Sequence, residues 1–526
     1  MRAVFRSRAS LAPFIKASTT ATVCALLGAF ASTAFSSYHA WPLFVSSLTF
    51  FFWWSERQER LTRFTPFFLW CWGLIATSFY WVSLSLGVDI GTFWVLLPLS
   101  LFVLPAIVAA MHATLWWGGM RLLKIESLAD IRFVPLFLLT WSLAEVLRST
   151  VFLGGLPWNL LGYMWADTAF MRHSVALWGT QALTLPTLLL FMLPTLWLAK
   201  EASKRYALAV TGLSVALLAG LGVFHAFYHH PVTTHKGPWL RLVQPNLPVS
   251  RHSRGPRVLE PLVKLSQQPG FRRATHVIWP EAVLPGYLVY RALDQLKLAP
   301  GQTLITGTVR RDNGRAYNSL AALDHKGALL ALYDKRNLTP FGEYVPGRAL
   351  LQKFFKGDAL QAITFRMNDF ASGAPVLPSV QLRNTPPFSP LICYDTAFEG
   401  NVVAPEGPRP SWLLEITNNA WFQSSWGLYQ HLDQGRFRAI EEGMPLVRCT
   451  NSGITSVISP YGEVLQQLPI QEPGVLDTAV PQALAPTPYH YGGRWPFGLT
   501  LAAMAMWLMV RTLQGDKKRR RRKRRT

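Results

Sequence analysis

Long apolar runs separated by short polar loops fill the first 231 residues of the chain, and one more run lies near its C-terminus. A helix needs about 20 predominantly apolar residues to cross the hydrocarbon core of a bilayer, and most of the runs approach that length. The pattern therefore predicts a membrane bundle of about eight helices. The eight predicted spans cover residues 17–35, 40–54, 64–82, 92–117, 133–153, 174–199, 206–228 and 495–510. The second and the last of these runs are the shortest.

The first run allows a second interpretation. Basic residues precede it, and small residues near 31–34 follow its apolar part, which is also typical of a cleavable signal peptide. The many apolar runs that come next favour a retained first span.

The charges between the runs predict an orientation. Lys and Arg gather at the N-terminus, in alternate loops and in the C-terminal tail, whereas the loops at 36–39 and 83–91 contain neither residue. The positive-inside rule then places both ends of the chain in the cytoplasm. Residues from about 232 to 492 lie on the opposite face, which in a Gram-negative-type cell is the periplasmic side of the inner membrane.

The net charge of +23 does not predict a nucleic-acid partner. Nine of the positive residues form one run, 517–525, a few residues after the last apolar segment. Such a run is most simply a cytoplasmic stop signal, and contact with anionic lipid adds to this role.

From Trp239 onward the pattern changes to short strand-like runs separated by turns and helical stretches. Asn313-Gly314 and the segment 324–327 are typical hairpin turns. About ten such strands with helices between them predict a layered α/β domain. The expected domains are thus a helical membrane domain at 1–231, an α/β domain at 232–492, and a last span with a basic tail at 493–526. The strand-like runs are 239–244, 275–280, 303–309, 317–324, 328–335, 390–395, 412–418, 445–451, 453–459 and 475–480.

Three chemically complementary side chains each follow a strand-like run. Cys393 ends one run, Glu281 ends another, and Lys335 ends a third. A thiol is mostly protonated at neutral pH, so a nucleophilic Cys needs a base or a positive neighbour. Glu281 can accept the thiol proton, and Lys335 can stabilise the oxyanion formed when the thiolate attacks a carbonyl, together with a backbone N–H near Tyr394. These parts suit acyl transfer through a covalent thioester.

The four cysteines do not predict a metal site. None forms a CxxC pair, and no His/Cys group has the spacing of a zinc site, so neither a metal nor another cofactor is expected. A disulfide between Cys393 and Cys449 stays open as an alternative in an oxidising compartment, and it would silence the proposed nucleophile.

The order of the motifs resembles the nitrilase superfamily, and the added spans resemble its membrane-anchored branch, the apolipoprotein N-acyltransferases. The motifs are WPE, YDKRNLTPFGEYVP, CYD, TNNAWF and the long segment 438–464. The resemblance implies an αββα sandwich on a membrane bundle and a Glu-Lys-Cys triad of Glu281, Lys335 and Cys393. It also implies that Cys393 takes an acyl chain from a phospholipid and that the thioester acylates the α-amine of a diacylglyceryl-cysteine lipoprotein.

Other residues are expected to support this site. Glu343 and Tyr394 are supporting residues by the resemblance, and Asp395 and Asn419 lie in the same motifs. Several positions depart from the family pattern: Asp395 replaces the usual Glu, Gln423 replaces Gly, Met444 replaces a common Arg, and the segment 251–253 lacks a common Trp.

Some features keep alternatives open. A membrane-tethered amidase would share the triad, a lipoprotein-binding module would carry it as a relic, and a transporter would leave the triad motifs unexplained. Residues 350–370 are either a lid over the site or an ordinary packed loop. Glu145 and Arg148, three residues apart on one predicted helix, are either a functional or a structural pair.

Overall fold

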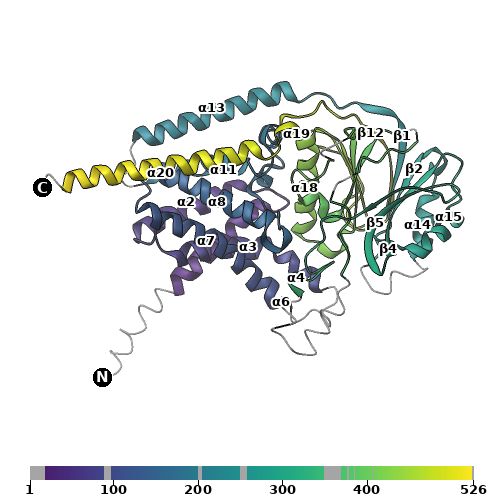
Figure 1. The fold of residues 1–526 in the computed structure, drawn as a ribbon, viewed down its shortest axis with the longest axis horizontal. Helices are drawn as coiled ribbons and strands as arrows, with labels where there is room; N and C mark the ends of the chain where they lie inside the picture. Colours follow the sequence, from purple (N-terminus) through teal and green to yellow (C-terminus); the bar gives the residue numbers. More distant parts are fainter. Residues whose placement is uncertain are drawn as a thin grey trace.

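A helical bundle and an α/β domain make up the chain in the computed structural model (Figure 1). The structure describes residues 18–87, 96–199, 204–248, 258–348, 353, 369–375, 378–383, 385–404 and 407–523. The lid expected over 350–370 lies outside the described residues, apart from positions 353, 369 and 370.

Within the described part of the chain, four helices are long and apolar enough to cross a membrane: Ser18–Phe35, Leu96–Leu123, Lys204–Tyr228 and Trp495–Gly515. The pair α3 (Phe64–Ser78) and α4 (Tyr80–Gly87), bent by 42°, makes a fifth if it is one broken span. The prediction of about eight spans is therefore not confirmed.

The remaining predicted spans are shorter or broken. Helix α2 (Trp41–Arg57) has 17 residues, and α8 (Phe133–Thr150) carries the buried Glu145 and Arg148. The run at 174–199 is divided into α10 (Val175–Trp178), α11 (Thr184–Phe191) and α12 (Leu193–Leu198), because Gly179 has a positive φ of 85° and Pro194 lies in the first turn of the last of these helices. All of these helices still contribute to one apolar core with the longer ones.

Twelve strands form two sheets in the described part of the α/β domain. The first sheet has seven strands in the order β12-β1-β2-β4-β5-β6, with β3 paired to β4, and the second has five in the order β11-β10-β9-β8-β7. Each of the ten strand-like runs of the sequence overlaps one of these strands. The strands are β1 (Thr234–Gln244), β2 (His276–Ile278), β3 (Leu284–Pro285), β4 (Thr303–Asp312), β5 (Arg315–Asp324), β6 (Leu329–Asp334), β7 (Phe388–Ile392), β8 (Trp412–Thr417), β9 (Leu446–Thr450), β10 (Ser456–Ile458), β11 (Val464–Gln467) and β12 (Gly474–Pro481).

Both predicted hairpin turns are confirmed. Asn313 and Gly314 have positive φ angles of 47° and 76° and join β4 to β5, whose pairing closes at Asp312 opposite Arg315. Two consecutive residues with positive φ match the twist of the flanking strands in a tight hairpin. The second turn joins β5 to β6, where Gly327 donates to the carbonyl of Asp324.

The layers follow from where apolar side chains are buried. One core lies between the two sheets, and another lies between the first sheet and two helices, α14 (Leu259–Ser266) and α15 (Val289–Leu296). Helix α18 (Trp426–Glu442) lies between the second sheet and the bundle, where its Phe437 and Ile440 join the apolar core of the bundle. The domain is thus an αββα sandwich whose last layer also contacts the bundle (Figure 1).

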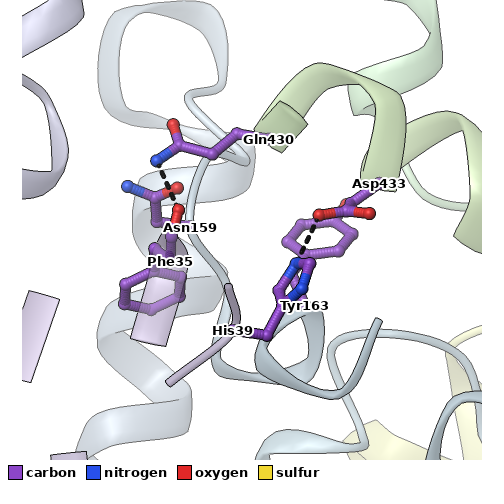
Figure 2. A pocket seen from close by; sticks show the side chains of 6 residues that line it. All are labelled: Phe35, His39, Asn159, Tyr163, Gln430 and Asp433. Atoms are coloured by element: carbon purple, nitrogen blue, oxygen red, sulfur yellow. Dashed lines mark hydrogen bonds and ion pairs between the residues drawn. The ribbon is translucent and has the colours of Figure 1, made fainter. Parts of the chain in front are cut away.

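Polar contacts of α18 hold the domain against the bundle. Figure 2 shows Gln430 donating to the carbonyl of Phe35, at 3.0 Å, and His39 bound to Asp433, at 2.7 Å. The second ring nitrogen of His39 lies 2.8 Å from Asp167. A cavity of about 10 Å³ between these groups has room for about one water molecule.

Candidate active site

The three side chains predicted to carry the chemistry all follow strands of the sandwich. Glu281 comes shortly after β2, Lys335 directly after β6, and Cys393 directly after β7. All three are drawn from different parts of the chain, and Glu281 and Lys335 are almost fully buried. The ends of these strands therefore bring an acid, an amine and a thiol into one region.

Lys335 joins two carboxylates. Its Nζ lies 2.8 Å from Glu343 Oε2 and 3.4 Å from Glu281 Oε1. The side-chain amide of Asn318 donates to both carboxylates, at 2.7 Å to Glu281 and 2.8 Å to Glu343. The backbone N–H of Asn418 donates to the other oxygen of Glu281, at 2.8 Å, so this carboxylate is held on both sides.

Burial and charge set the protonation of these groups. Burial raises the pKa of Glu281, and the charge of Lys335 opposes this effect only in part. Burial lowers the pKa of Lys335, but the carboxylates of Glu343 and Glu281 outweigh it and hold this pKa well above its ordinary value. The amine therefore stays charged, while Glu281 has an increased affinity for a proton.

Cys393 is a free thiol close to both charges. Burial raises its pKa above the ordinary value, the charge of Glu281 raises it further, and the charge of Lys335 lowers it. The thiol is thus protonated at neutral pH and needs a base before it can attack. Cys393 also has a positive φ of 50°, a conformation that non-glycine residues adopt at an energetic cost and that occurs often at functional sites.

The disulfide alternative is wrong. Cys393 and Cys449 are both free, and the Cys449 thiol is fully buried, with its sulfur 3.4 Å from the carbonyl oxygen of Ile278. Burial raises the pKa of Cys449 to about 12, as expected for an unreactive thiol in a core.

A loop of the bundle contacts the segment that carries Cys393. The Tyr394 hydroxyl donates to the carbonyl of Gly155, at 3.0 Å, and the Tyr394 ring stacks on Trp158 with centroids 6.3 Å apart. The Tyr344 hydroxyl donates to the carbonyl of Leu153, at 2.8 Å. Two motif tyrosines therefore anchor the site on the segment that follows α8.

Asp395 organises the turn around Cys393. It accepts hydrogen bonds from the Ile392 N–H at 3.0 Å, the Tyr333 hydroxyl at 2.9 Å, and both the backbone and side-chain nitrogens of Asn337 at 2.9 and 3.0 Å. These bonds join the end of β7 to the segment that follows β6. The shorter carboxylate that replaces the usual Glu is thus fully hydrogen-bonded.

Asn419 belongs to a buried polar network behind Cys393. Its side chain lies 2.8 Å from His431 Nδ1 and 3.0 Å from Arg448, and Arg448 also pairs with Glu415. Neither His431 nor Asn318 was predicted from the sequence, because each is one of several polar residues in its element and belongs to no motif quoted for the site. Neither residue therefore stood out from its neighbours in the sequence.

Two of the departures have a structural explanation. Gln423 has a φ of 48° and a ψ of −151°, a combination that suits the Gly expected there. Met444 is fully buried in the same apolar cluster as residues of both sheets, where a charged Arg would be costly. The segment 251–253 lies outside the described residues.

Glu145 and Arg148 bind different partners within the bundle. Glu145 accepts from the Thr184 hydroxyl at 2.6 Å and from the Leu161 N–H at 3.0 Å, and Arg148 donates to the carbonyls of Trp158 and Asn159. Their contacts favour the structural interpretation. Within the described ranges, no group of three His, Cys, Asp or Glu side chains is arranged to hold a metal ion.

Known proteins match both parts of the chain. Residues 240–489 match the family described as Carbon-nitrogen hydrolase, and residues 27–193 match the Apolipoprotein N-acyltransferase N-terminal domain. The apolipoprotein N-acyltransferase of Rhodopseudomonas palustris is 32% identical over 519 residues, which cover 93% of this chain and 95% of the relative. The apolipoprotein N-acyltransferase of Bradyrhizobium diazoefficiens is 34% identical over 445 residues, which cover 80% of this chain and 81% of the relative. A solved amidase from Nesterenkonia sp. is 17% identical, covers 52% of this chain and 98% of its own, and has a TM-score of 0.32.

The family match and the fold together define a carbon-nitrogen hydrolase domain joined to a bundle of apolar helices. With relatives matched over nearly their whole length, the chain belongs to the apolipoprotein N-acyltransferase family. It is an acyltransferase of lipoprotein biosynthesis. This membership does not favour the amidase or the binding-module alternative.

Proposed function

We propose that the enzyme moves an acyl chain from a phospholipid to Cys393 and then to the α-amine of a diacylglyceryl-cysteine lipoprotein. The observation that carries this proposal is the charged, buried arrangement of Lys335 between Glu281 and Glu343, acting on the Cys393 thiol. A protonated thiol beside a carboxylate of raised pKa suits a reaction that needs a base and later an acid.

In the first half-reaction, Glu281 accepts the thiol proton as the sulfur attacks the ester carbonyl carbon of the phospholipid. The ammonium of Lys335 and a backbone N–H near Tyr394 stabilise the oxyanion. The carbon–oxygen bond then breaks, Glu281 returns its proton to the leaving alkoxide, and a lysophospholipid departs. Cys393 is left as a thioester.

In the second half-reaction, the α-amine of the acceptor attacks the thioester. Glu281 takes a proton from the amine, the carbon–sulfur bond breaks, and the thiolate of Cys393 regains the proton. The products are an amide-linked acyl chain and the free thiol, so one carboxylate serves both halves. Glu343 holds Lys335 in place, and Tyr394, Asp395 and Asn419 support the turn that carries Cys393.

We propose eight spans, with the acyl-transferring domain, residues 232–492, on the periplasmic side of the inner membrane. Residues 1–231 and 493–526 form the membrane part. The shared apolar core of α2, α8, α11 and α12 with the longer helices supports this count. The arrangement of two long helices, α13 (Lys204–Tyr228) and α20 (Trp495–Lys523), also supports eight spans. Both helices run along the bundle, and the α/β domain lies at one end of the bundle (Figure 1).

The test is an assay with phosphatidylethanolamine and a synthetic diacylglyceryl-cysteine peptide, with the peptide products measured by mass spectrometry. The expected product is the peptide plus one acyl chain, formed by the unmodified enzyme and not by Cys393→Ala. Release of free fatty acid without an acylated peptide would instead mean a hydrolase, and this result would overturn the proposal.

A further inference from the structure

The backbone of the nucleophile is held from behind. Cys393 has a positive φ of 50°, and its carbonyl oxygen accepts a hydrogen bond from the Thr396 hydroxyl at 2.8 Å. His431 Nε2, on α18, lies 3.2 Å from the same carbonyl oxygen and 3.2 Å from the Thr396 hydroxyl. A strained turn persists only when its surroundings hold it, and these contacts do so.

The partners of His431 decide its tautomer. The Nδ1 atom lies 2.8 Å from the side-chain nitrogen of Asn419 and 2.9 Å from Arg448 Nη2, and both of these nitrogens are donors. Asn419 is oriented by Arg448, which donates to its oxygen at 3.0 Å. Because two donors face Nδ1, this atom is the acceptor, and the proton of the neutral ring lies on Nε2.

The charged groups around the ring favour this neutral form. Burial lowers the pKa of His431 well below its ordinary value, and the charges of Arg448 and Lys335 lower it further. Glu415, whose Oε1 lies 3.5 Å from Nε2, is paired with Arg448. The Nε2–H group is thus available to Cys393 and Thr396 as a donor.

The bond to the carbonyl has a consequence on the other side of the peptide unit. A trans peptide is planar, so the C=O of Cys393 and the N–H of Tyr394 are fixed in one plane and point in opposite directions. A donor that holds the carbonyl therefore also fixes where the N–H points. That N–H is the backbone group proposed above to stabilise the oxyanion.

We propose that His431 is a positioning residue for acyl transfer: its Nε2–H holds the Cys393 carbonyl and thereby aims the Tyr394 N–H at the developing oxyanion. Asn419 and Arg448 set its tautomer. This inference rests on the proposed function, since it assigns a role within the same thioester chemistry.

Two variants of His431 separate positioning from packing. His431→Gln keeps an N–H donor at about the place of Nε2, whereas His431→Met fills similar space without one. Both lose the acceptor at Nδ1, so the pair differs mainly in the donor. His276→Met, which removes another buried histidine from β2, is the matched control for general destabilisation.

The rate of thioester formation on Cys393 is measured in a single turnover with phosphatidylethanolamine, beside alkylation of the thiol by iodoacetamide. We expect His431→Met to slow thioester formation about 10- to 100-fold, somewhat less than the loss of an oxyanion donor itself. Alkylation should change little, because it needs no oxyanion, and His431→Gln should recover most of the rate. Equal loss in both variants, or loss of alkylation in parallel, would overturn the inference.

A second readout does not depend on a folded Met variant. ¹⁵N spectra of the histidine-labelled enzyme, with the His431 signals assigned from His431→Gln, should show a protonated Nε2 and a bare Nδ1. The opposite tautomer would overturn the inference. Absence of any thioester in the unmodified enzyme would instead refute the proposed function, and the tautomer measurement would still test the hydrogen bond.

Discussion

The ammonium of Lys335 lies closer to Glu343, at 2.8 Å, than to the proposed base Glu281, at 3.4 Å. The lysine ammonium therefore interacts more strongly with Glu343 than with Glu281. The negative charge of Glu343 also raises the pKa of Glu281. The supporting carboxylate keeps the proposed base basic in spite of the neighbouring cation.

Glu343→Gln tests this relationship. The change removes a negative charge beside Glu281, lowers the pKa of that carboxyl and weakens it as a base. We expect thioester formation to slow about 10- to 100-fold, part of the 10²- to 10⁴-fold that acid–base catalysis contributes. Single-turnover kinetics measure this change, with Glu260→Gln, at an exposed position of α14, as the control. A rate equal to that of the unmodified enzyme would contradict the role of Glu343.

Asp395→Asn should destabilise the fold. All four partners of Asp395 donate hydrogen bonds to it, so an amide would place its own donor against another donor. An unsatisfied buried group costs about 1–3 kcal/mol. Thermal unfolding in detergent should give a lower Tm for this variant and an unchanged one for Asp294→Asn on α15. An unchanged Tm for Asp395→Asn would mean that the network rearranges at little cost.

His39 predicts a pH-dependent contact between the bundle and α18. Burial lowers its pKa, but the charge of Asp433 and hydrogen bonds with Asp167 and Asp433 outweigh this effect and raise the pKa to about 10. A pKa raised in the folded state contributes stability that is fully present below the unfolded value of about 6.5 and is lost as pH rises toward 10. The Tm difference between the unmodified enzyme and His39→Gln should therefore be largest near pH 6 and shrink by pH 9.

The control for this prediction is His325→Gln in the β5–β6 turn, which should change Tm little at either pH. A Tm difference for His39→Gln that grows with pH would have the wrong sign for an ion pair between a charged ring and two carboxylates.

Gln423→Gly should stabilise the enzyme. At a φ of 48° and a ψ of −151°, a side chain costs about 1–3 kcal/mol that glycine avoids. The change also removes the hydrogen bond from Gln423 to the carbonyl of Leu84, worth about 1 kcal/mol, so the net gain is about 1 kcal/mol. Gln423→Ala loses the bond and keeps the strain, so its Tm should fall while that of Gln423→Gly rises.

Much of the sandwich was predictable, because its strands are short β-rich runs bounded by turn residues. All ten predicted runs overlap strands, whereas β3 and β11 were missed: β3 has two residues, and the four of β11 are mostly exposed. The spans were harder to predict from hydropathy alone. The length of an apolar run does not show where the helix within it breaks, as it does at Gly179. In addition, a helix that is covered by its neighbours does not need an apolar surface on every side.

The site was predictable only where motif residues lie at strand ends. Glu281, Lys335 and Cys393 each have a recognisable context, and Glu343 is part of one such motif. Asn318 and His431 act through contacts between distant segments, 37 residues apart for Asn318 and Glu281 and 38 for His431 and Cys393. Contacts of this kind depend on strand register and helix placement, which no local pattern encodes.

The central claim is that Cys393 carries the acyl chain. Intact-mass and peptide mass spectrometry after incubation with phosphatidylethanolamine, without acceptor, tests it most directly. We predict one acyl adduct on Cys393 that hydroxylamine removes and that is absent in Glu281→Ala and Lys335→Ala. No adduct on the unmodified enzyme, or an adduct that persists in both variants, would contradict the account.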